Sequence, residues 1–130
     1  MTRLAYVDAS AMVKLVLPEA ESAEMRRWYV EAERMATSRL GIVETTRAAA
    51  RHPHDADHLR FVLGSIEVVE LDPMIANRAA AVGPADLRAL DAIHLATALQ
   101  LGDEVTSFVT YDDRLAQAAR AVGLEVIRPA

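Results

Sequence analysis

The stretch VTSFVTYDDRLAQAARAVGLEVI, residues 105–127, decides the fold class of this chain. Residues 105–111 are rich in β-branched and aromatic side chains and predict a strand. Residues 112–123 predict a helix, because an Asp stands at their start and a Gly at their end. Residues 124–127 predict a further strand. A strand, a helix and a strand in succession are typical of an α/β domain.

The same alternation of strands and helices extends to the N-terminus. Hydrophobic patterning predicts strands over residues 4–8, 35–38 and 66–72, and helices over residues 9–17, 19–35, 39–51, 54–65, 73–83 and 87–99. No repeat, linker or low-complexity segment interrupts this pattern. We therefore predict a single α/β domain over residues 1–130, with a parallel sheet covered by helices on both faces.

Composition limits the class of protein. With 52% hydrophobic and 25% charged residues the chain is unlike disordered sequences, and no apolar run is long enough to span a membrane. Residues 1–10, MTRLAYVDAS, do not have the pattern of a signal peptide, so we expect a cytoplasmic protein. The absence of cysteine excludes disulfides, zinc–thiolate sites and thiol nucleophiles.

The net charge of −5 argues against a protein that binds nucleic acid through a generally basic surface. A local basic patch around an acidic, metal-filled site is still compatible with this charge. Lys14 is the single lysine, so such a patch consists mainly of arginines, which make bidentate contacts with phosphates.

Acidic residues follow two of the predicted strands. Asp8 ends the first strand, and Asp112 and Asp113 follow the strand over residues 105–111. In parallel sheets of this kind the functional crevice lies at the carboxyl ends of the strands. If these two strands are neighbours, Asp91, on the helix before the later strand, and Glu44, on an earlier helix, can join Asp8 and Asp112 above one edge of the sheet.

Four carboxylates in a partly buried site repel one another and raise one another's pKa values unless a cation is present. Magnesium or manganese suits such a site, because hard divalent cations prefer carboxylate oxygens and water as ligands. These ions activate water and stabilise charge on phosphoryl groups, which is the chemistry of metal-dependent nucleases.

Structural roles are alternatives for each of these acids. Asp8 is a suitable N-cap for the helix that follows it, and Asp112 or Asp113 for the last helix. Glu44 has the spacing for a surface ion pair with Arg47. Asp91 has Arg88 one turn before it, but the helix 87–99, LRALDAIHLATAL, is apolar on nearly every face, and this favours a functional role for the Asp91 in its middle.

Histidines in the chain are interpreted as structural. His94 lies on an apolar helix and is expected to be a hydrogen-bonded core residue. His52, His54 and His58 occur in a polar stretch with two aspartates, where a solvated helix start is favoured over a surface metal site.

Four segments together resemble a known family. They are YVDASAMVKL at residues 6–15, VETTRAA at 43–49, LRALDAIHLATAL at 87–99, and FVTYDDRLAQAARAVGLEVI at 108–127. In this order and at this spacing they resemble the PIN domain, specifically the VapC-type ribonuclease toxins of bacterial toxin–antitoxin pairs. The resemblance covers essentially the whole chain.

The resemblance implies a PIN-like three-layer α/β/α fold with a five-stranded parallel sheet of order 3-2-1-4-5. It assigns the four acidic positions that bind magnesium or manganese to Asp8, Glu44, Asp91 and Asp112. It also implies that Ser10 and Thr110 orient water or a substrate phosphate. We expect Asp112 to be the fourth ligand and the adjacent Asp113 to be a supporting or capping residue.

The implied activity is RNA hydrolysis by a metal-activated water, leaving a 5'-phosphate and a 3'-hydroxyl. Candidate RNA contacts are Arg47, Arg51, Arg88 and Arg114, for which helix solubility and ion pairs are the alternative roles. The resemblance further implies a homodimer and a cognate VapB-like antitoxin lying in a groove beside the site. The second helix, with Met25, Trp28 and Tyr29, can supply part of such a surface, although we expect core packing for at least one of these aromatics.

Rival classes fit the sequence less well. A response-regulator receiver requires a lysine after its last strand, and the only lysine here is Lys14. A haloacid-dehalogenase-type phosphatase requires Asp-x-Asp after its first strand, where this chain has Asp8-Ala9-Ser10. The remaining alternative is a catalytically weak or inactive PIN-like module that binds RNA or a protein partner.

Overall fold

The sheet has five parallel strands in the order β3-β2-β1-β4-β5 in the computed structural model, which describes residues 2–130. This is the predicted order, with the first strand at the centre. The strands are β1 (Leu4–Val7), β2 (Arg34–Ser38), β3 (Glu67–Val69), β4 (Val105–Val109) and β5 (Val126–Ile127).

The register of the central strand brings two predicted site segments together. β1 pairs with β4 so that Val7 lies opposite Val109, the last residue of each strand. Asp8 then continues the ladder by donating its N–H to the Val109 carbonyl at 3.2 Å. Asp8 and Thr110 are therefore neighbours at the carboxyl edge of the sheet.

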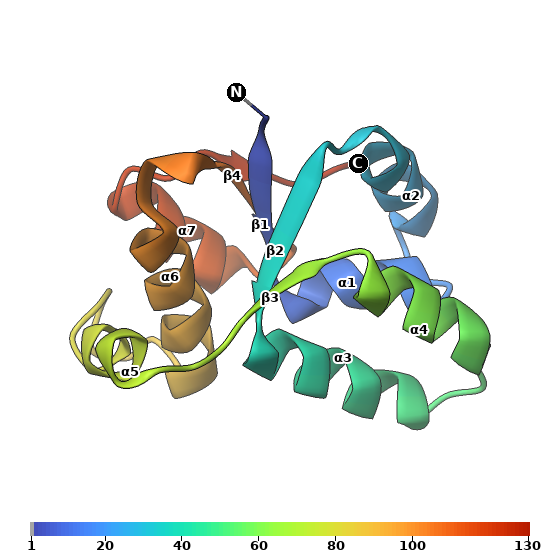
Figure 1. The fold of residues 1–130 in the computed structure, drawn as a ribbon, viewed down its shortest axis with the longest axis horizontal. Coiled ribbons are helices and arrows are strands. Elements are labelled where there is room, and N and C mark those ends of the chain that lie inside the picture. The colour runs from blue at the N-terminus through green and yellow to red at the C-terminus, as the bar shows by residue number, and fades with distance from the viewer. Residues whose placement is uncertain (1) are drawn as a thin grey trace.

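Helices cover both faces of the sheet, as predicted. Figure 1 shows α1 to α4 on one side of the sheet and α5 to α7 on the other. Their bounds are α1 (Ala9–Val16), α2 (Ser22–Glu31), α3 (Arg39–Ala50), α4 (Ala56–Gly64), α5 (Pro73–Ala79), α6 (Ala89–Leu101) and α7 (Asp113–Ala121), and a 3-10 turn, Gly102–Glu104, follows α6. Among the described residues none of these helices has the length and hydrophobicity of a membrane-spanning segment.

Alternation along the strands produces two hydrophobic cores, because successive side chains of a strand point to opposite faces. Ala5 and Val7 enter the core under α1, α2 and α4, which is formed with Met12, Leu15, Met25, Met35, Val62 and Ile66. Tyr6 points the other way, into the core under α6 and α7, which is formed with Leu95, Ala98, Phe108, Leu115 and Ala119. Trp28 and Tyr29 are partly buried against the first core, as expected for core packing.

The start of α6 differs from the prediction and moves Asp91. The helix begins at Ala89 rather than residue 87, because Gly83 has a positive φ of 73° and Arg88 is an extended N-cap. Asp91 therefore lies in the first turn, not in the middle of the helix. A carboxylate there interacts favourably with the helix dipole.

The second helix is shorter than predicted. α2 covers Ser22–Glu31 rather than residues 19–35, since Glu21 before it adopts a left-handed conformation with φ of 67°. At its other end the chain is extended from Ala32, and Met35 is in β2. Residues 34 and 35 therefore pair with β1 as part of the sheet, although their hydrophobic periodicity predicts a helix.

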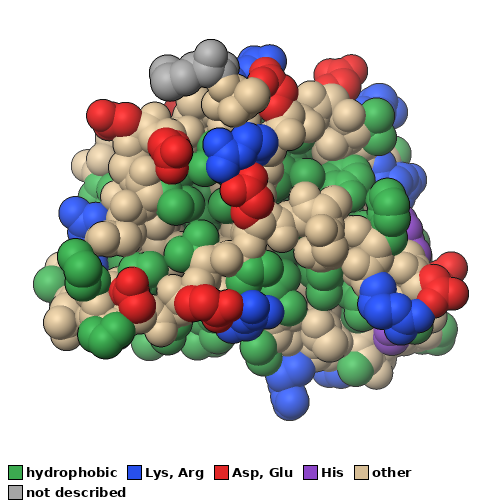
Figure 2. Space-filling model, in the orientation of Figure 1, with side chains coloured by type: hydrophobic (Ala, Val, Ile, Leu, Met, Phe, Trp, Pro, Cys, Tyr) green, Lys and Arg blue, Asp and Glu red, His purple; other side chains and the backbone are tan. Residues whose placement is uncertain are grey.

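The segment between α4 and α6 is also less regular than its sequence suggests. β3 covers three residues rather than residues 66–72, because Asp72 caps α5 by accepting a hydrogen bond from the Ile75 N–H at 2.8 Å. α5 ends at Ala79 rather than at residue 83. Figure 2 shows hydrophobic side chains gathered at the lower left, over α5, while charges of both signs are spread over the rest of this face.

Candidate functional site

Asp8 is the innermost carboxylate at the carboxyl edge of the sheet, with 3% of its surface exposed. Its Oδ1 accepts hydrogen bonds from Ser10 Oγ at 2.7 Å and from the Ala11 N–H at 3.0 Å, which makes it the N-cap of α1. Its Oδ2 accepts a hydrogen bond from Thr110 Oγ1 at 2.5 Å. Burial raises the pKa of Asp8, while a positive charge on His94 and these hydrogen bonds act in the opposite direction.

Hydroxyl groups connect Asp8 to the end of β4. Ser10 Oγ accepts a hydrogen bond from the Tyr111 N–H at 2.8 Å, and Thr110 Oγ1 accepts one from the Asp112 N–H at 3.0 Å. The two hydroxyl oxygens lie 3.4 Å apart. Ser10 and Thr110 thus hold Asp8 and Asp112 in fixed relative positions.

Asp112 and Asp113 have different surroundings. Asp112 is half-buried and caps α7, because its Oδ1 accepts a hydrogen bond from the Leu115 N–H at 3.0 Å. Asp113 is exposed and pairs with Arg128. Of the two roles expected for Asp113, the capping role is wrong, since Asp112 makes the cap, and the supporting role stays a prediction. Asp113 is not among the carboxylates that raise the pKa of Asp91.

Asp91 is half-buried and lies among the other three predicted acids. Burial raises its pKa first, and the negative charges of Asp112, Asp8 and Glu44 raise it further, against a lowering by His94. No ion pair joins Asp91 to Arg88 within residues 2–130, so this structural alternative is not realised. The acidic cluster, as we call Asp8, Glu44, Asp91 and Asp112, is thus brought together from four elements or their ends.

Glu44 enters the acidic cluster from α3 and is held by a histidine. Its Oε1 lies 2.6 Å from His94 Nε2, and the Glu44 side chain is 27% exposed. The surface pair with Arg47 considered from the sequence is absent among the described residues. His94 is a buried, hydrogen-bonded histidine, as predicted, but its contact with a member of the acidic cluster was not predicted.

The donor set of the acidic cluster suits a hard divalent cation. All four residues offer carboxylate oxygens, and their mutual repulsion raises the pKa of Asp91. Within residues 2–130 no three acidic or histidine side chains are already close enough to share one ion. Uncompensated carboxylates are expected to stay apart in this way, because a cation is what removes their repulsion.

A groove of about 580 Å³ lies beside the acidic cluster, between α1, α3 and the start of α6. Val43 and Leu90 give it an apolar lining and are each 47% exposed. Glu44 connects the groove to the acidic cluster, and Arg47 and Arg51 line it further along α3. The other two candidate RNA contacts, Arg88 and Arg114, are exposed but do not line the groove.

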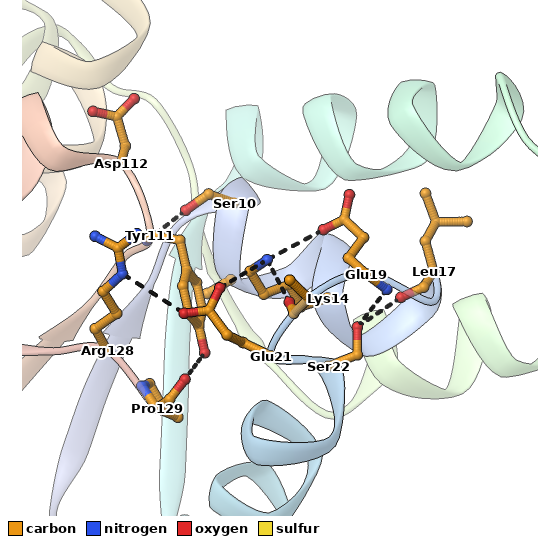
Figure 3. A network of polar contacts seen from close by, with 12 residues as sticks. Ser10, Lys14, Leu17, Glu19, Glu21, Ser22, Tyr111, Asp112, Arg128 and Pro129 are labelled. Atoms are coloured by element: carbon orange, nitrogen blue, oxygen red, sulfur yellow. Dashed lines mark hydrogen bonds and ion pairs between the residues drawn. The ribbon is translucent and has the colours of Figure 1, made fainter.

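Tyr111 forms the end of this groove next to Asp112. Figure 3 shows its ring between the side chains of Lys14 and Arg128, which lie 4.6 Å and 5.6 Å from the ring centre. The Tyr111 hydroxyl donates to the Pro129 carbonyl at 2.6 Å. Burial first, and then the charge of Glu21, raise the pKa of Tyr111 to about 12.

Lys14 is already neutralised where it borders the groove. Its ammonium donates to the Ala20 carbonyl at 2.7 Å and lies 3.6 Å and 3.5 Å from carboxylate oxygens of Glu19 and Glu21. These contacts tie the loop between α1 and α2 to Tyr111 (Figure 3). They therefore support the segment that carries Thr110 and Asp112.

The histidines at residues 52, 54 and 58 do not form a metal site among the described residues. His52 and His54 are exposed before α4, whose N-cap is Asp55. His58 Nε2 lies 2.9 Å from the Leu15 carbonyl. The solvated helix start favoured from the sequence is what the structure has.

The sequence is similar to those of known proteins. The PIN domain family model matches residues 5–121. The chain is 42% identical over 130 residues to Ribonuclease VapC47 of Mycobacterium tuberculosis, which covers 95% of this chain and 96% of that protein. It is 38% identical over 125 residues to Ribonuclease VapC46 of the same species, with the same coverage of both chains.

Comparison by structure gives the same fold. The crystal structure of Mycobacterium tuberculosis VapC20, a sarcin–ricin loop cleaving toxin, superposes with a TM-score of 0.74 over 96% of this chain and 99% of that one. The sequence identity is 17%, so this likeness concerns the fold alone.

Proposed function

The chain belongs to the PIN-domain family, and from its relationship to VapC ribonucleases we propose that it is a metal-dependent endoribonuclease toxin. The observation that carries this proposal is the convergence of Asp8, Glu44 and Asp112 on Asp91, whose pKa is raised by burial and by these carboxylates. A cation offsets the repulsion within such a cluster, and the relationship to ribonucleases supports RNA as the class of substrate.

The acidic cluster is the proposed site for Mg²⁺, with Mn²⁺ able to replace it. A bound ion of this kind activates water and stabilises the charge that develops on a phosphoryl oxygen. Asp8 is kept in one orientation by Ser10 and Thr110, each of which donates a hydrogen bond to it. We expect water to attack phosphorus and the P–O3' bond to break, which leaves a 5'-phosphate and a 3'-hydroxyl on the leaving oxygen. Because the RNA 2'-hydroxyl is not the nucleophile, no 2',3'-cyclic phosphate is formed.

The groove is the proposed path of the RNA strand. Arg47 and Arg51 line it and are placed to bind backbone phosphates, for which guanidinium groups are well suited. The exposed side chains of Val43 and Leu90 offer apolar contact for unstacked bases. Arg88 and Arg114 lie outside the groove, so we assign them at most to RNA flanking the scissile bond.

The proposed protein partners are a VapB-like antitoxin and a second copy of the chain. An antitoxin segment in the groove would present an Arg or Lys to the acidic cluster, where it replaces the missing positive charge. Leu71 and Met74, before and in α5, are 46% and 64% exposed, and exposed apolar side chains of this kind support association between two copies. Light scattering on the purified chain measures its oligomeric state.

The test of the proposed function is RNA cleavage by the purified, antitoxin-free chain. Total bacterial RNA is incubated with and without Mg²⁺ or Mn²⁺, and the ends of the fragments are mapped chemically. We expect discrete cuts with 5'-phosphate ends that disappear with a chelator and in Asp8→Asn. Metal and RNA binding without any cuts would instead support a non-cleaving PIN module.

A further inference from the structure

His94 is a buried titratable residue that the proposed reaction does not use directly. It lies on α6 one turn after Asp91, and only 2% of it is exposed. Both of its ring nitrogens are engaged: Nδ1 lies 2.6 Å from the Tyr6 hydroxyl, and Nε2 lies 2.6 Å from Glu44 Oε1. The ring therefore connects the core of the molecule to the acidic cluster.

The partners of Tyr6 and His94 indicate which atom donates in each of these hydrogen bonds. The Ser38 N–H donates to the Tyr6 oxygen at 3.1 Å, so the Tyr6 hydroxyl proton points to His94 Nδ1. With Nδ1 as acceptor, Nε2 is assigned the ring proton and donates it to the Glu44 carboxylate. Tyr6 is itself fixed, because its ring is fully buried and stacks on Phe108 at 5.2 Å between ring centres.

A close approach of α3 makes the contact with Glu44 possible. Gly41 stands one turn before Glu44, and a Cβ at residue 41 would lie 3.1 Å from His94 Cε1 and 2.4 Å from Thr37 Oγ1. Any side chain there would therefore force the helix away from the imidazole. The lack of a side chain at Gly41 lets α3 bring Glu44 within hydrogen-bond distance of His94.

We propose that His94 is a positioning residue, which, backed by Tyr6, fixes the Glu44 carboxylate in the acidic cluster for cation binding. This inference rests on the proposed function of the cluster. Glu44 has a flexible side chain at the edge of the groove, and within residues 2–130 its Oε1 is bonded by His94 while its Oε2 makes no hydrogen bond. A fixed Oε1 leaves Oε2 presented to the cation. Groups that orient metal-binding carboxylates in this way strengthen metal binding.

The first experiment measures Mn²⁺ binding to the metal-free full chain by calorimetry. We expect His94→Leu to weaken binding by about 10- to 100-fold, which is typical of losing a group that orients a ligand. His94→Gln should retain most of the affinity, because its amide can donate to Glu44 in place of Nε2. The matched control is Leu95→Val, since Leu95 is equally buried on α6 but packs in the hydrophobic core and has no group that can bond Glu44, and we expect wild-type affinity.

The second experiment repeats the His94→Leu substitution in a Glu44→Gln background. If His94 acts through Glu44, His94→Leu changes Mn²⁺ affinity in the wild-type background but hardly at all in the Glu44→Gln background. Equal losses in both backgrounds would indicate general damage to the site and would overturn the proposal. Unchanged affinity of the single variant would overturn it too.

Tyr6→Phe provides an independent variant if His94→Leu does not fold. It removes one hydroxyl and keeps the stacked ring, so His94 loses the partner that fixes its tautomer. We expect weaker Mn²⁺ binding that again depends on Glu44, and wild-type affinity would contradict the proposal. A wild-type chain that binds no Mn²⁺ overturns the proposed function itself, whereas wild-type binding with insensitive His94 and Tyr6 variants overturns only the positioning role.

Discussion

The two ends of the sheet hold their acidic side chains in opposite electrostatic conditions. At the amino ends of β2 and β3, Arg34 binds Glu67 through two nitrogens, at 2.9 and 2.8 Å, and lowers its pKa. At the carboxyl ends of β1 and β4, burial raises the pKa values of Asp8 and Asp91, and neighbouring carboxylates raise that of Asp91 further. Glu67 is thus paired with an arginine, whereas the carboxylates at the carboxyl ends of β1 and β4 lie close to one another.

This difference identifies the end of the molecule at which we propose that a divalent cation binds. Exposed pairs such as Arg34–Glu67 contribute little to stability, because solvent screens them. A half-buried carboxylate beside other carboxylates is unfavourable in the protein alone, and such sites are characteristic of function. We therefore expect equivalent substitutions at the two ends of the sheet to have very different effects on RNA cleavage and on stability.

The largest expected effect is on catalysis. Asp91→Asn should reduce RNA cleavage by about a hundredfold or more, because losing a metal ligand removes several kcal/mol of transition-state stabilisation. Glu67→Gln at the other end of the sheet is the matched control and should cleave at close to the wild-type rate. Initial rates on one RNA substrate at saturating Mg²⁺ measure the activity of both variants. Similar rates for the two variants would contradict the claim that the acidic cluster is the catalytic site.

The next effect is stabilisation by metal. At a free ion concentration of one hundred times Kd, Mg²⁺ or Mn²⁺ should raise the free energy of unfolding by about 2.7 kcal/mol. This increase should vanish in Asp91→Asn and persist in Glu67→Gln. Urea unfolding with and without the ion measures it, and an increase that survives Asp91→Asn would place the ion elsewhere.

A smaller effect is expected from Lys14, which borders the groove. Lys14→Met should lower the free energy of unfolding by about 1–2 kcal/mol, because it removes the contacts with Tyr111 and the Ala20 carbonyl and the ion pairs with Glu19 and Glu21. Thermal unfolding measures this loss. A stabilised Lys14→Met would mean that the Lys14 network does not support the groove.

The smallest effect concerns the metal-free protein. Because the pKa of Asp91 is raised in the folded state, the folded chain binds more protons than the unfolded chain between the ordinary value of 3.8 and the raised value. Its ionisation therefore costs stability as pH rises through this window. At pH 7, Asp91→Asn should be more stable than wild type by up to about 1 kcal/mol, allowing for solvent screening.

At the opposite end of the sheet, ionisation of Glu67 should raise stability rather than lower it. The lowered pKa of Glu67 contributes stability above its ordinary value of 4.5, and this contribution is lost as pH falls through the folded-state pKa. The difference between wild type and Asp91→Asn should thus disappear at low pH, while Glu67→Gln should be no more stable than wild type at pH 7. Urea unfolding from pH 3 to 7 without metal compares them, and a destabilised Asp91→Asn at pH 7 would contradict this sign.

Much of the fold and the members of the acidic cluster were predictable from the sequence. The alternation of strands and helices predicts the parallel sheet. Asp8 and Asp112 each follow a strand, and the resemblance to the PIN domain implied that these two strands are neighbours. The position of Asp91 was predicted as a charge on an apolar helix. Its place in the first turn was not predicted, because the sequence between Gly83 and Arg88 has no periodicity that marks where the helix begins.

The partner of Glu44 was not predictable. Sequence spacing favours Arg47, which is three residues away on the same helix, whereas the actual partner is His94, fifty residues away. Tyr6 was missed for the same reason, since an aromatic residue in a buried strand predicts packing and nothing about its hydroxyl. Gly41 within a predicted helix is the one local signal of a close approach, but it does not identify the neighbour.

The most direct test of the central claim is calorimetric titration of Mg²⁺ and Mn²⁺ into the metal-free wild-type chain and Asp8→Asn. Asp8 lies at the centre of the acidic cluster, and Asn keeps its shape and its cap on α1. The account predicts saturable binding to wild type and little or none to Asp8→Asn. Equal binding to both proteins, or no binding to either, would contradict the claim that these carboxylates converge to hold a divalent cation.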